Sequence, residues 1–219
     1  MVVSQPIIMG VLNITPDSFS DGGLFFDSKS AITQAEVMVK EGAGIIDIGG
    51  ESTRPGAPEV SIEDELNRVI PVIEALSSNI DVPISIDTSK PIVMEKAFNA
   101  GASIINDVNA LRSEGALQMA ASLQADVCLM HMQGSPRTMQ KNPTYDNVVS
   151  DVKAFFEQRI EACKSAGIKL NAITLDPGFG FGKNLGHNIA LLKNLSEFHE
   201  FGVSILAGLS RKSMIGSLL

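Results

Sequence analysis

The feature that most limits the fold of this chain is a repeat of short apolar runs separated by longer amphipathic stretches. Seven runs, rich in β-branched residues, cover residues 6–14, 44–50, 83–87, 103–107, 126–130, 172–176 and 204–210. Such nearly continuous apolar runs are typical of parallel strands that are buried on both faces. Helical patterns lie between them at residues 28–41, 61–78, 90–100, 114–123, 148–166 and 187–201, the last of which is weaker and is expected to be broken. The repeat therefore predicts an α/β protein with a parallel sheet.

Helix boundary signals agree with this division of the chain. Ser61 opens the sequence Ser-Ile-Glu-Asp, which has the shape of a capping box with Asp64 at the third helical position. Gly42 and Gly101 directly follow two of the helical stretches, where glycine commonly ends a helix. No low-complexity segment or linker interrupts residues 1–219, so we expect one domain.

Polar residues at the ends of the predicted strands help to choose between two architectures, a doubly wound open sheet and a TIM (β/α)8 barrel. These residues are Asn13, Asp47, Asp87, Asn106, Asp107, His131, Asp176 and Ser210. In a barrel the carboxyl ends of all strands meet on one face, whereas an open sheet gathers its site at one switch point. Polar ends on all seven strands therefore favour the barrel.

Charge and composition exclude several classes of function. The chain has 17 basic and 25 acidic side chains, a net charge of −8, which provides no overall basic surface for nucleic acid or an anionic membrane. No apolar run approaches the roughly 20 residues of a membrane-spanning helix, and the N-terminal residues show no signal-peptide pattern. Cys128 and Cys163 lie far apart, so we expect two reduced core thiols in a cytoplasmic protein.

Two polar loops follow the first two predicted strands. Asn13 offers an amide oxygen at a strand end, a suitable ligand for Mg²⁺, and Asp17 and Asp21 are further candidates. The competing interpretation of the first loop is a turn rich in Asp, Asn and Gly. In the second loop, Thr53 and Arg54 follow two glycines, and the arginine is suited either to a phosphate or to a salt bridge between loops.

Asp87, Asn106 and Asp176 form a set of carboxylates and one amide at strand ends. Three such groups at one apolar mouth present acceptors to a ring that carries several N–H donors. The competing interpretation is that they cap the following helices. It is strongest for Asp87, which precedes a plausible helix entry, and weaker for the other two.

Two further segments combine glycine, aromatic and cationic residues. Residues 176–183 contain three glycines in five positions but lack the ending of a phosphate-binding Walker motif. Phe181 is therefore expected either to line a site for an aromatic substrate or to anchor a mobile loop. Arg211 and Lys212 are adjacent cations at a strand end and a predicted helix start, which suits an anion or a carbonyl group.

Other catalytic signatures are missing from the sequence. His131 has no partner at metal-ligand spacing and is expected to be structural. The chain has no HExxH, no Cys/His cluster and no GxSxG, so neither a zinc hydrolase nor a serine esterase is supported.

Seven segments match a known pattern in order: NITPDSFSDGG, DIGGESTRPGA, ISIDTSKP, IIND, LMHMQGSP, LDPGFGFGKN and GLSRKSMIG. With these motifs the chain resembles bacterial dihydropteroate synthases over residues 8–219. This family uses a (β/α)8 barrel to join p-aminobenzoate to 6-hydroxymethyl-7,8-dihydropterin diphosphate. Diphosphate leaves and 7,8-dihydropteroate, a folate precursor, forms.

The resemblance implies a role for each candidate residue. Asn13 would bind Mg²⁺, the implied cofactor, which also contacts the diphosphate. The pterin ring would be held by Asp87, Asn106, Asp176 and Lys212, in a pocket lined by Asp47 and Met130. Thr53 and Arg54 would lie near the diphosphate and the second substrate. The p-aminobenzoate site would be formed by Phe19, Pro55, Phe181 and Ser213. Lys212, Asp87 and Asp176 are the expected catalytic residues, and they act by stabilising charge because the C–O bond breaks before the amine attacks.

The family pattern continues beyond residue 219 with an eighth strand that carries an Arg-x-His motif and a final helix. We therefore expect a TIM barrel whose eighth βα unit is missing from this chain, with reduced folding or activity when the chain is expressed alone. The resemblance also implies a homodimer for the full-length enzyme. Two other functions remain open: a pterin- or folate-binding barrel of the methyltransferase type, and an inactive relative that acts through interaction.

Overall fold

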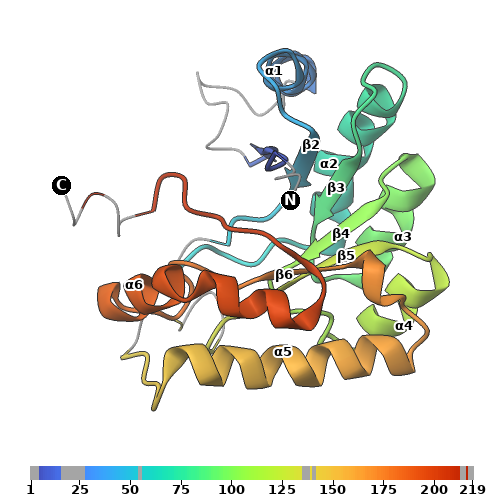
Figure 1. Ribbon diagram of the computed structural model, residues 1–219. Coiled ribbons are helices and arrows are strands. Elements are labelled where there is room, and N and C mark those ends of the chain that lie inside the picture. Colours follow the sequence, from blue (N-terminus) through green and yellow to red (C-terminus); the bar gives the residue numbers. More distant parts are fainter. Residues whose placement is uncertain are drawn as a thin grey trace. The chain divides into compact units, whose positions relative to one another are not determined.

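The computed structural model describes residues 5–15, 28–53, 56–134, 139, 142–212 and 216 (Figure 1). The chain divides into two compact units. Unit 1 comprises Met1–Ser52 and Glu59–Asn106, and unit 2 comprises Thr53–Pro58 and Asp107–Leu219. In both units, strands alternate with helices, as the apolar repeat predicts.

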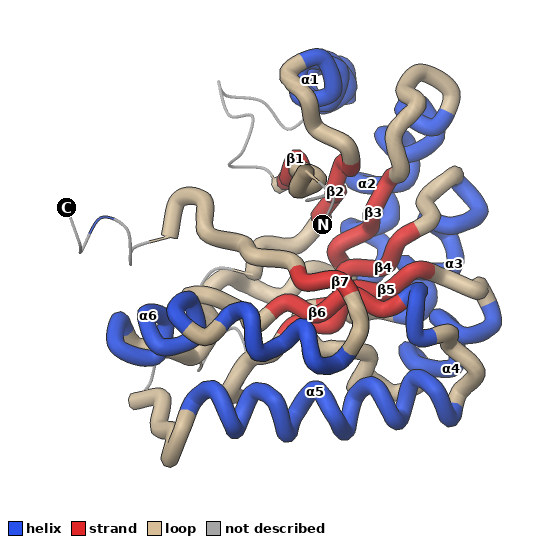
Figure 2. Tube along the Cα trace, viewed as in Figure 1, coloured by secondary structure: helices blue, strands red, loops and turns tan. Residues whose placement is uncertain are grey.

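Unit 1 contains the first strands and helices of the chain. They are β1 (Met9–Asn13), α1 (Ser28–Lys40), β2 (Ile45–Gly49), α2 (Ile62–Ser77), β3 (Ile84–Asp87), α3 (Pro91–Ala100) and β4 (Ile104–Asp107). The strands pair in parallel and in chain order, so that each helix connects two neighbouring strands. Figure 2 shows β2, β3 and β4 side by side in red.

Helix α2 shows why the sequence folds locally as predicted. The side chain of Ser61 accepts a hydrogen bond of 3.0 Å from the backbone N–H of Asp64, which satisfies a free donor at the helix start and confirms the predicted cap. Its buried stripe comprises Glu65, Val69, Val72, Ile73 and Leu76. This helical spacing turns one face of α2 toward the core of unit 1.

Unit 2 contains the remaining strands and helices. They are α4 (Ala116–Ser122), β5 (Asp126–Met130), α5 (Val148–Ser165), the 3-10 turn η1 (Leu170–Ala172), β6 (Ile173–Asp176), α6 (Leu185–Lys193), the 3-10 helix η2 (Leu195–Phe201) and β7 (Ser204–Ile205). Strands β5, β6 and β7 again pair in parallel and in chain order. The long helix α5 runs beside α6 (Figure 1).

The core of unit 2 is built around an aromatic side chain of α5. Phe156 is fully buried and makes edge contacts with Phe198 and Phe201 of η2, at ring-centroid distances of 5.9 and 6.4 Å. Cys128 on β5 and Cys163 on α5 are both buried and free, as expected for core thiols.

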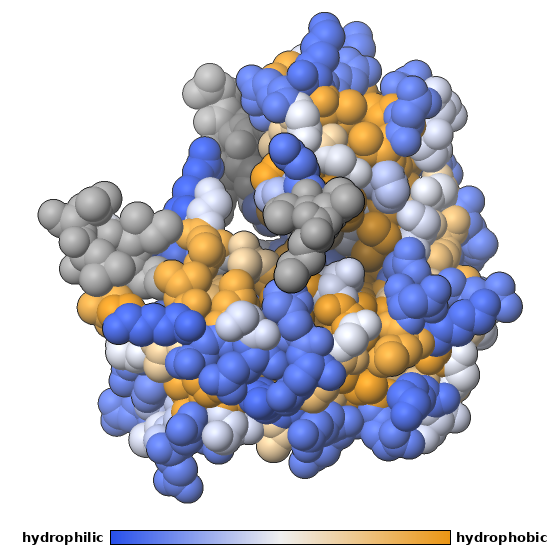
Figure 3. Space-filling model, in the orientation of Figure 1, coloured by the Kyte–Doolittle hydropathy of each residue, from blue (hydrophilic) through white to orange (hydrophobic). Residues whose placement is uncertain are grey.

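The structure shortens several predicted segments. The helical pattern at residues 187–201 divides at Asn194 into α6 and η2, which confirms the expected break. The predicted strand at residues 204–210 pairs only at Ser204–Ile205. Within the described residues, no helix is long and apolar enough to cross a membrane. Apolar residues are nevertheless visible on the surface (Figure 3), and Ile7, Ile8 and Val11 are the most exposed of the large ones.

Candidate active site

The strand register of unit 1 places three predicted site residues and one glycine in one row. Asn13 of β1 is opposite Gly49 of β2, Gly49 is opposite Asp87 of β3, and Asp87 is opposite Asn106 of β4. All four lie at the carboxyl ends of their strands. The sequence argument from polar strand ends is therefore confirmed within this unit for these residues.

Gly49 leaves space between two of these side chains. A Cβ atom added at Gly49 would lie 3.5 Å from Oδ1 of Asn13 and 3.5 Å from Oδ2 of Asp87. Amide and carboxylate oxygens are hard ligands of the kind that Mg²⁺ prefers. Both oxygens therefore border the space over the glycine and are of the type that a magnesium ion takes as ligands, whereas no group of three His, Cys, Asp or Glu residues that could hold a metal ion occurs in the described part of the chain.

Asp47 is a buried acid beside this row. It is 3% exposed, and Asn106 donates a hydrogen bond from Nδ2 to its Oδ2 at 3.0 Å. Burial raises the pKa of Asp47, while the amide of Asn106 and the hydroxyl of its register partner Ser85 partly offset this shift. Asn106 therefore has a structural partner as well as its predicted role toward the substrate.

Asp87 does not occupy the N-cap position of α3. The residue at the N-cap position of α3 is Lys90, which makes no side-chain cap hydrogen bond, and Pro91 starts the helix. Asp107 behaves differently, because its two carboxylate oxygens each accept a backbone N–H at 2.7 Å, from Asn109 and Leu111. Asp107 is thus a turn-forming residue, whereas Asp87 remains a candidate for the site.

A charged cluster at the base of the second loop was not predicted from the sequence. Lys90 Nζ contacts Oε2 of Glu51 and Oε2 of Glu65, which is fully buried. Burial alone would lower the pKa of Lys90, but the two carboxylates raise it above its ordinary value. The available signal was the position of Glu65 on the apolar stripe of α2, four residues before Val69.

Asp176 ends β6 and is the buried acid of unit 2. Its Oδ1 accepts a 2.8 Å hydrogen bond from the backbone N–H of Gly178, and Oδ2 lies near Gly208, where no side chain fills the space. Burial raises the pKa of Asp176, while the N–H of Gly178, Lys212 and Lys183 act in the opposite direction. An acid in this setting can accept hydrogen bonds from a ring N–H and an amino group.

Lys212 and Phe181 lie together in the same unit. Lys212 Nζ is 4.2 Å from the centre of the Phe181 ring, a cation–π distance. Burial lowers the pKa of Lys212, and the negative charge of Asp176 opposes this shift. Met130, the register partner of Asp176, packs in a cluster with Met132 and Met139, against which Phe181 also packs. Four predicted site residues therefore meet around the end of β6.

The loop at residues 178–182 approaches the segment after β5 so closely that two of its glycines are required. At Gly178 (φ +70°) an added Cβ would lie 2.0 Å from the carbonyl oxygen of His131, and at Gly182 (φ +60°) it would lie 2.8 Å from that of Gln133. L-residues also rarely adopt these φ values. The glycine-rich motif is thus explained by backbone-to-backbone packing.

His131 is buried, as expected for a structural histidine, but it has an unexpected partner. Its Nδ1 lies 2.9 Å from Nζ of Lys183, which is only 3% exposed. Burial, together with Lys183 and Arg112, lowers the pKa of His131 to about 3, so the ring is neutral. Burial also lowers the pKa of Lys183, to about 7. In the sequence, Lys183 was only the last residue of the glycine-rich motif.

The structure describes only two of the remaining predicted loop residues. Thr53 is half-buried, and Arg211 is exposed with a positive φ of 57°. Asp17, Phe19, Asp21, Arg54, Pro55 and Ser213 lie outside the described residues. Their roles remain predictions.

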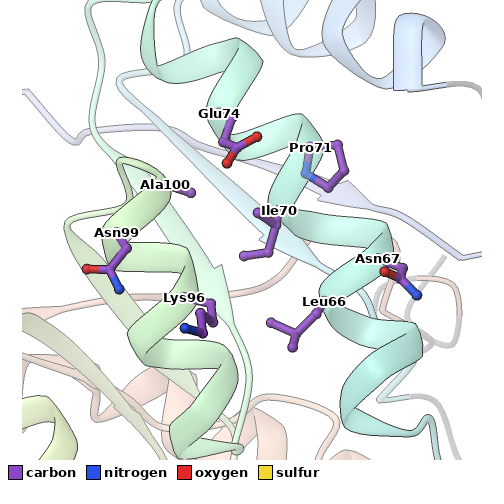
Figure 4. Close-up of a pocket in the computed structure, with 8 residues that line it drawn as sticks. All are labelled: Leu66, Asn67, Ile70, Pro71, Glu74, Lys96, Asn99 and Ala100. Atoms are coloured by element: carbon purple, nitrogen blue, oxygen red, sulfur yellow. The ribbon is translucent and has the colours of Figure 1, made fainter.

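A groove of about 420 Å³ lies elsewhere in unit 1, between α2 and α3 (Figure 4). Leu66, Ile70 and Pro71 of α2 face Lys96 and Asn99 of α3 across it. None of the predicted site residues lines this groove. This groove therefore does not coincide with the candidate site.

Comparisons with known proteins identify the family of the chain. A family model described as pterin binding enzyme matches residues 9–219. Dihydropteroate synthase of Haemophilus influenzae is 57% identical over 99% of this chain and 79% of its own length. For the same enzyme of Escherichia coli K12 the values are 55%, 99% and 77%.

Solved structures give the fold. Dihydropteroate synthase of Yersinia pestis, in complex with a sulfonamide drug, superimposes with a TM-score of 0.93 at 54% identity, over 98% of this chain and 78% of its own. The Xanthomonas albilineans enzyme with 4-aminobenzoic acid gives 0.92 at 50% identity, over 98% of this chain and 77% of its own. The fold is thus of the TIM-barrel type, these residues carry seven of its parallel strands, and the chain spans about 77–79% of the length of these relatives. The chain belongs to the dihydropteroate synthases, a family of pterin-binding enzymes.

Proposed function

We propose that the enzyme joins p-aminobenzoate to 6-hydroxymethyl-7,8-dihydropterin diphosphate. The nitrogen of the amine forms a bond to the exocyclic methylene carbon of the pterin and loses a proton. The bond between that carbon and the diphosphate oxygen breaks, and diphosphate leaves with the electron pair. The observation that carries this proposal is the cluster of Asp176, Lys212 and Phe181 at the end of β6.

The pterin ring is bound by complementary donors and acceptors. Asp176 accepts from the ring N–H and the amino group, and Lys212 donates to the ring carbonyl or a ring nitrogen. The family resemblance assigns Asp87 and Asn106, neighbours in the strand row of unit 1, to the same ring. Polar groups that the fold holds in place stabilise the cation that forms when the C–O bond breaks, so no nucleophilic side chain is needed.

Magnesium is part of the proposal. Asn13 would hold it, and the hollow over Gly49 brings Oδ1 of Asn13 and Oδ2 of Asp87 near one another. A bound magnesium ion supplies positive charge that stabilises the departing diphosphate. Arg54 and Thr53 are proposed to contact the diphosphate side, and Phe19, Pro55, Phe181 and Ser213 the p-aminobenzoate side.

The experiment is diphosphate release with both substrates present. We expect release to depend on p-aminobenzoate and to fall by about 100-fold or more in Asp176→Asn, because a preorganised charge is removed. Asp126→Asn, at the exposed opposite end of β5, is the matched control and should retain the wild-type rate. Pterin binding without p-aminobenzoate-dependent release would contradict the synthase and favour the binding-barrel alternative.

Two further assignments, the oligomeric state and the cellular location, complete the proposal. We infer a homodimer, as the family resemblance implies, which light scattering after size-exclusion chromatography measures directly. We also place the enzyme in the cytoplasm, which fits its two buried free cysteines. Cell fractionation tests this location.

A further inference from the structure

Lys183 is a buried cation that the proposed reaction does not use. Its Nζ donates hydrogen bonds to the carbonyl oxygens of Gly178 and Phe181, both at 3.0 Å, and of His131, at 3.1 Å. The fourth contact is with Nδ1 of the neutral His131 ring. A buried lysine is costly unless it is fully hydrogen-bonded, and here four acceptors compete for three ammonium protons.

These acceptors belong to two different segments. Gly178 and Phe181 lie in the loop after β6, whereas His131 directly follows β5. The ammonium group therefore links the loop to the end of the neighbouring strand. The backbone N–H of Phe181 also donates to the carbonyl of Gly178, and that of Gly180 donates to Oδ1 of Asn188 in α6, so the loop is held by its own backbone and by α6 as well.

The loop in turn determines where Lys212 can lie. The Phe181 ring is beneath Lys212 Nζ at 4.2 Å, and a Cβ added at Gly180 would come within 3.1 Å of Lys212 Cδ. Little space separates the loop from the lysine side chain. A loop that shifted by even 1 Å would displace the lysine from its position beside Asp176, and misplacements of this size can cost about 100-fold in rate.

We propose that Lys183 is a positioning residue, which fastens the loop at residues 178–182 to the end of β5 and thereby holds Phe181 against Lys212. The kinetic part of this inference rests on the proposed synthase function. Lys183 also lies close enough to Asp176 to favour its ionised form, as Lys212 does. Loss of the Lys183 charge should therefore move the acid limb of the pH–rate profile to higher pH, a change that a purely structural role would not produce.

The experiment compares Lys183→Met, which keeps the length of the side chain without its charge, with Lys164→Met on the exposed face of α5. In Lys183→Met we expect faster amide hydrogen exchange at Gly178, Gly180 and Phe181, and a kcat/KM lower by about 10- to 100-fold. The control should change neither quantity. In a Phe181→Leu background, measured at a pH above the acid limb and below 7, where Lys183 is still charged, the further effect of Lys183→Met should shrink to within about twofold, because the same contact is already lost.

Three results would overturn the inference. They are unchanged exchange in the loop of Lys183→Met, a full kinetic loss that persists in the Phe181→Leu background, and an acid limb that does not move. If Lys183→Met does not fold, the wild-type protein provides the test below pH 7, where Lys183 is protonated. A hydrogen-bonded buried ammonium then gives a slowly exchanging lysine side-chain signal in nitrogen-15 NMR, and its absence refutes the contact. Loop exchange needs no substrate, so it separates failure of this inference from failure of the proposed reaction.

Discussion

Removal of Lys90 should destabilise the protein strongly, because it leaves a fully buried carboxylate without a partner. Glu65 is 0% exposed, and its Oε1 has no hydrogen-bond partner among the described residues. Its Oε2 forms an ion pair with Nζ of Lys90, which also pairs with the partly exposed Glu51. In Lys90→Met the methylene stem is largely kept, so the change isolates the loss of charge.

The magnitude follows from the burial of the two acids. Loss of one partner of a buried ion pair costs about 3–5 kcal/mol, which is a large share of the total stability of a typical domain. Glu51→Gln should cost no more than about 1 kcal/mol, because the side chain of Glu51 is 30% exposed and solvent screens its charge. The difference in unfolding free energy between Lys90→Met and Glu51→Gln therefore reports the burial of the acid that is left unpaired, and not the number of ion pairs removed.

Urea unfolding followed by far-ultraviolet circular dichroism measures these differences as a change in midpoint at constant slope. Adding Glu65→Gln to Lys90→Met should restore most of the lost stability, since it removes the unpaired charge. The raised pKa of Lys90 means that the wild-type contribution is present below pH 10.5 and is lost as the pH rises through the higher folded-state pKa. A loss below 1 kcal/mol in Lys90→Met, or no recovery in the double variant, would refute the reasoning.

The remaining predictions concern the cap of α2, the row at Gly49 and the acid at the end of β6. Ser61→Ala should lower the free energy of unfolding by about 1 kcal/mol in the same urea assay, because the N–H of Asp64 loses its acceptor. Gly49→Ala should fold with unchanged or slightly higher stability, but its Cβ would fill the hollow between Asn13 and Asp87. Calorimetry should therefore show weaker magnesium-dependent binding of diphosphate. Unchanged binding would argue against a magnesium site at this position. Because the pKa of Asp176 is raised by burial, pterin affinity measured by fluorescence should decline on acidification already above pH 3.8, and Asp176→Asn should remove this transition without lowering stability at pH 7. A pH-independent pterin affinity of the wild-type protein, or a clearly destabilised Asp176→Asn variant, would contradict the raised pKa of Asp176.

Periodicity and strand-end chemistry predicted most of the fold. The seven apolar runs all contain strands, and the predicted strand at residues 126–130 matches β5 residue for residue. Strand ends could be placed less well, because pairing depends on a neighbour: β7 stops at Ile205 although the apolar pattern continues to Ser210. The break at Asn194 was expected because the helical pattern of residues 187–201 is weak.

The sequence predicted which side chains of unit 2 lie close together but not the groups that hold them, and the roles of these side chains remain predictions. Asp176, Lys212 and Phe181 come together as the motifs indicate, since each follows a strand. The contact of Asn106 with Asp47 depends on strand register, which the sequence does not contain. Lys183 could not be recognised because three of its four partners are backbone carbonyls, which no residue type reveals.

The two cysteines have a practical consequence for measuring how the molecule opens. Both lie in unit 2, and unit 1 has none, since the chain contains only Cys128 and Cys163. Burial raises the pKa of Cys163 to about 11, and the reactive thiolate is therefore suppressed as long as the side chain stays in the core. The rate of thiol labelling under native conditions thus reports the transient opening of one unit alone. Mass spectrometry of the labelled peptides would then distinguish the loosening of α5 from that of β5, without any probe having been introduced.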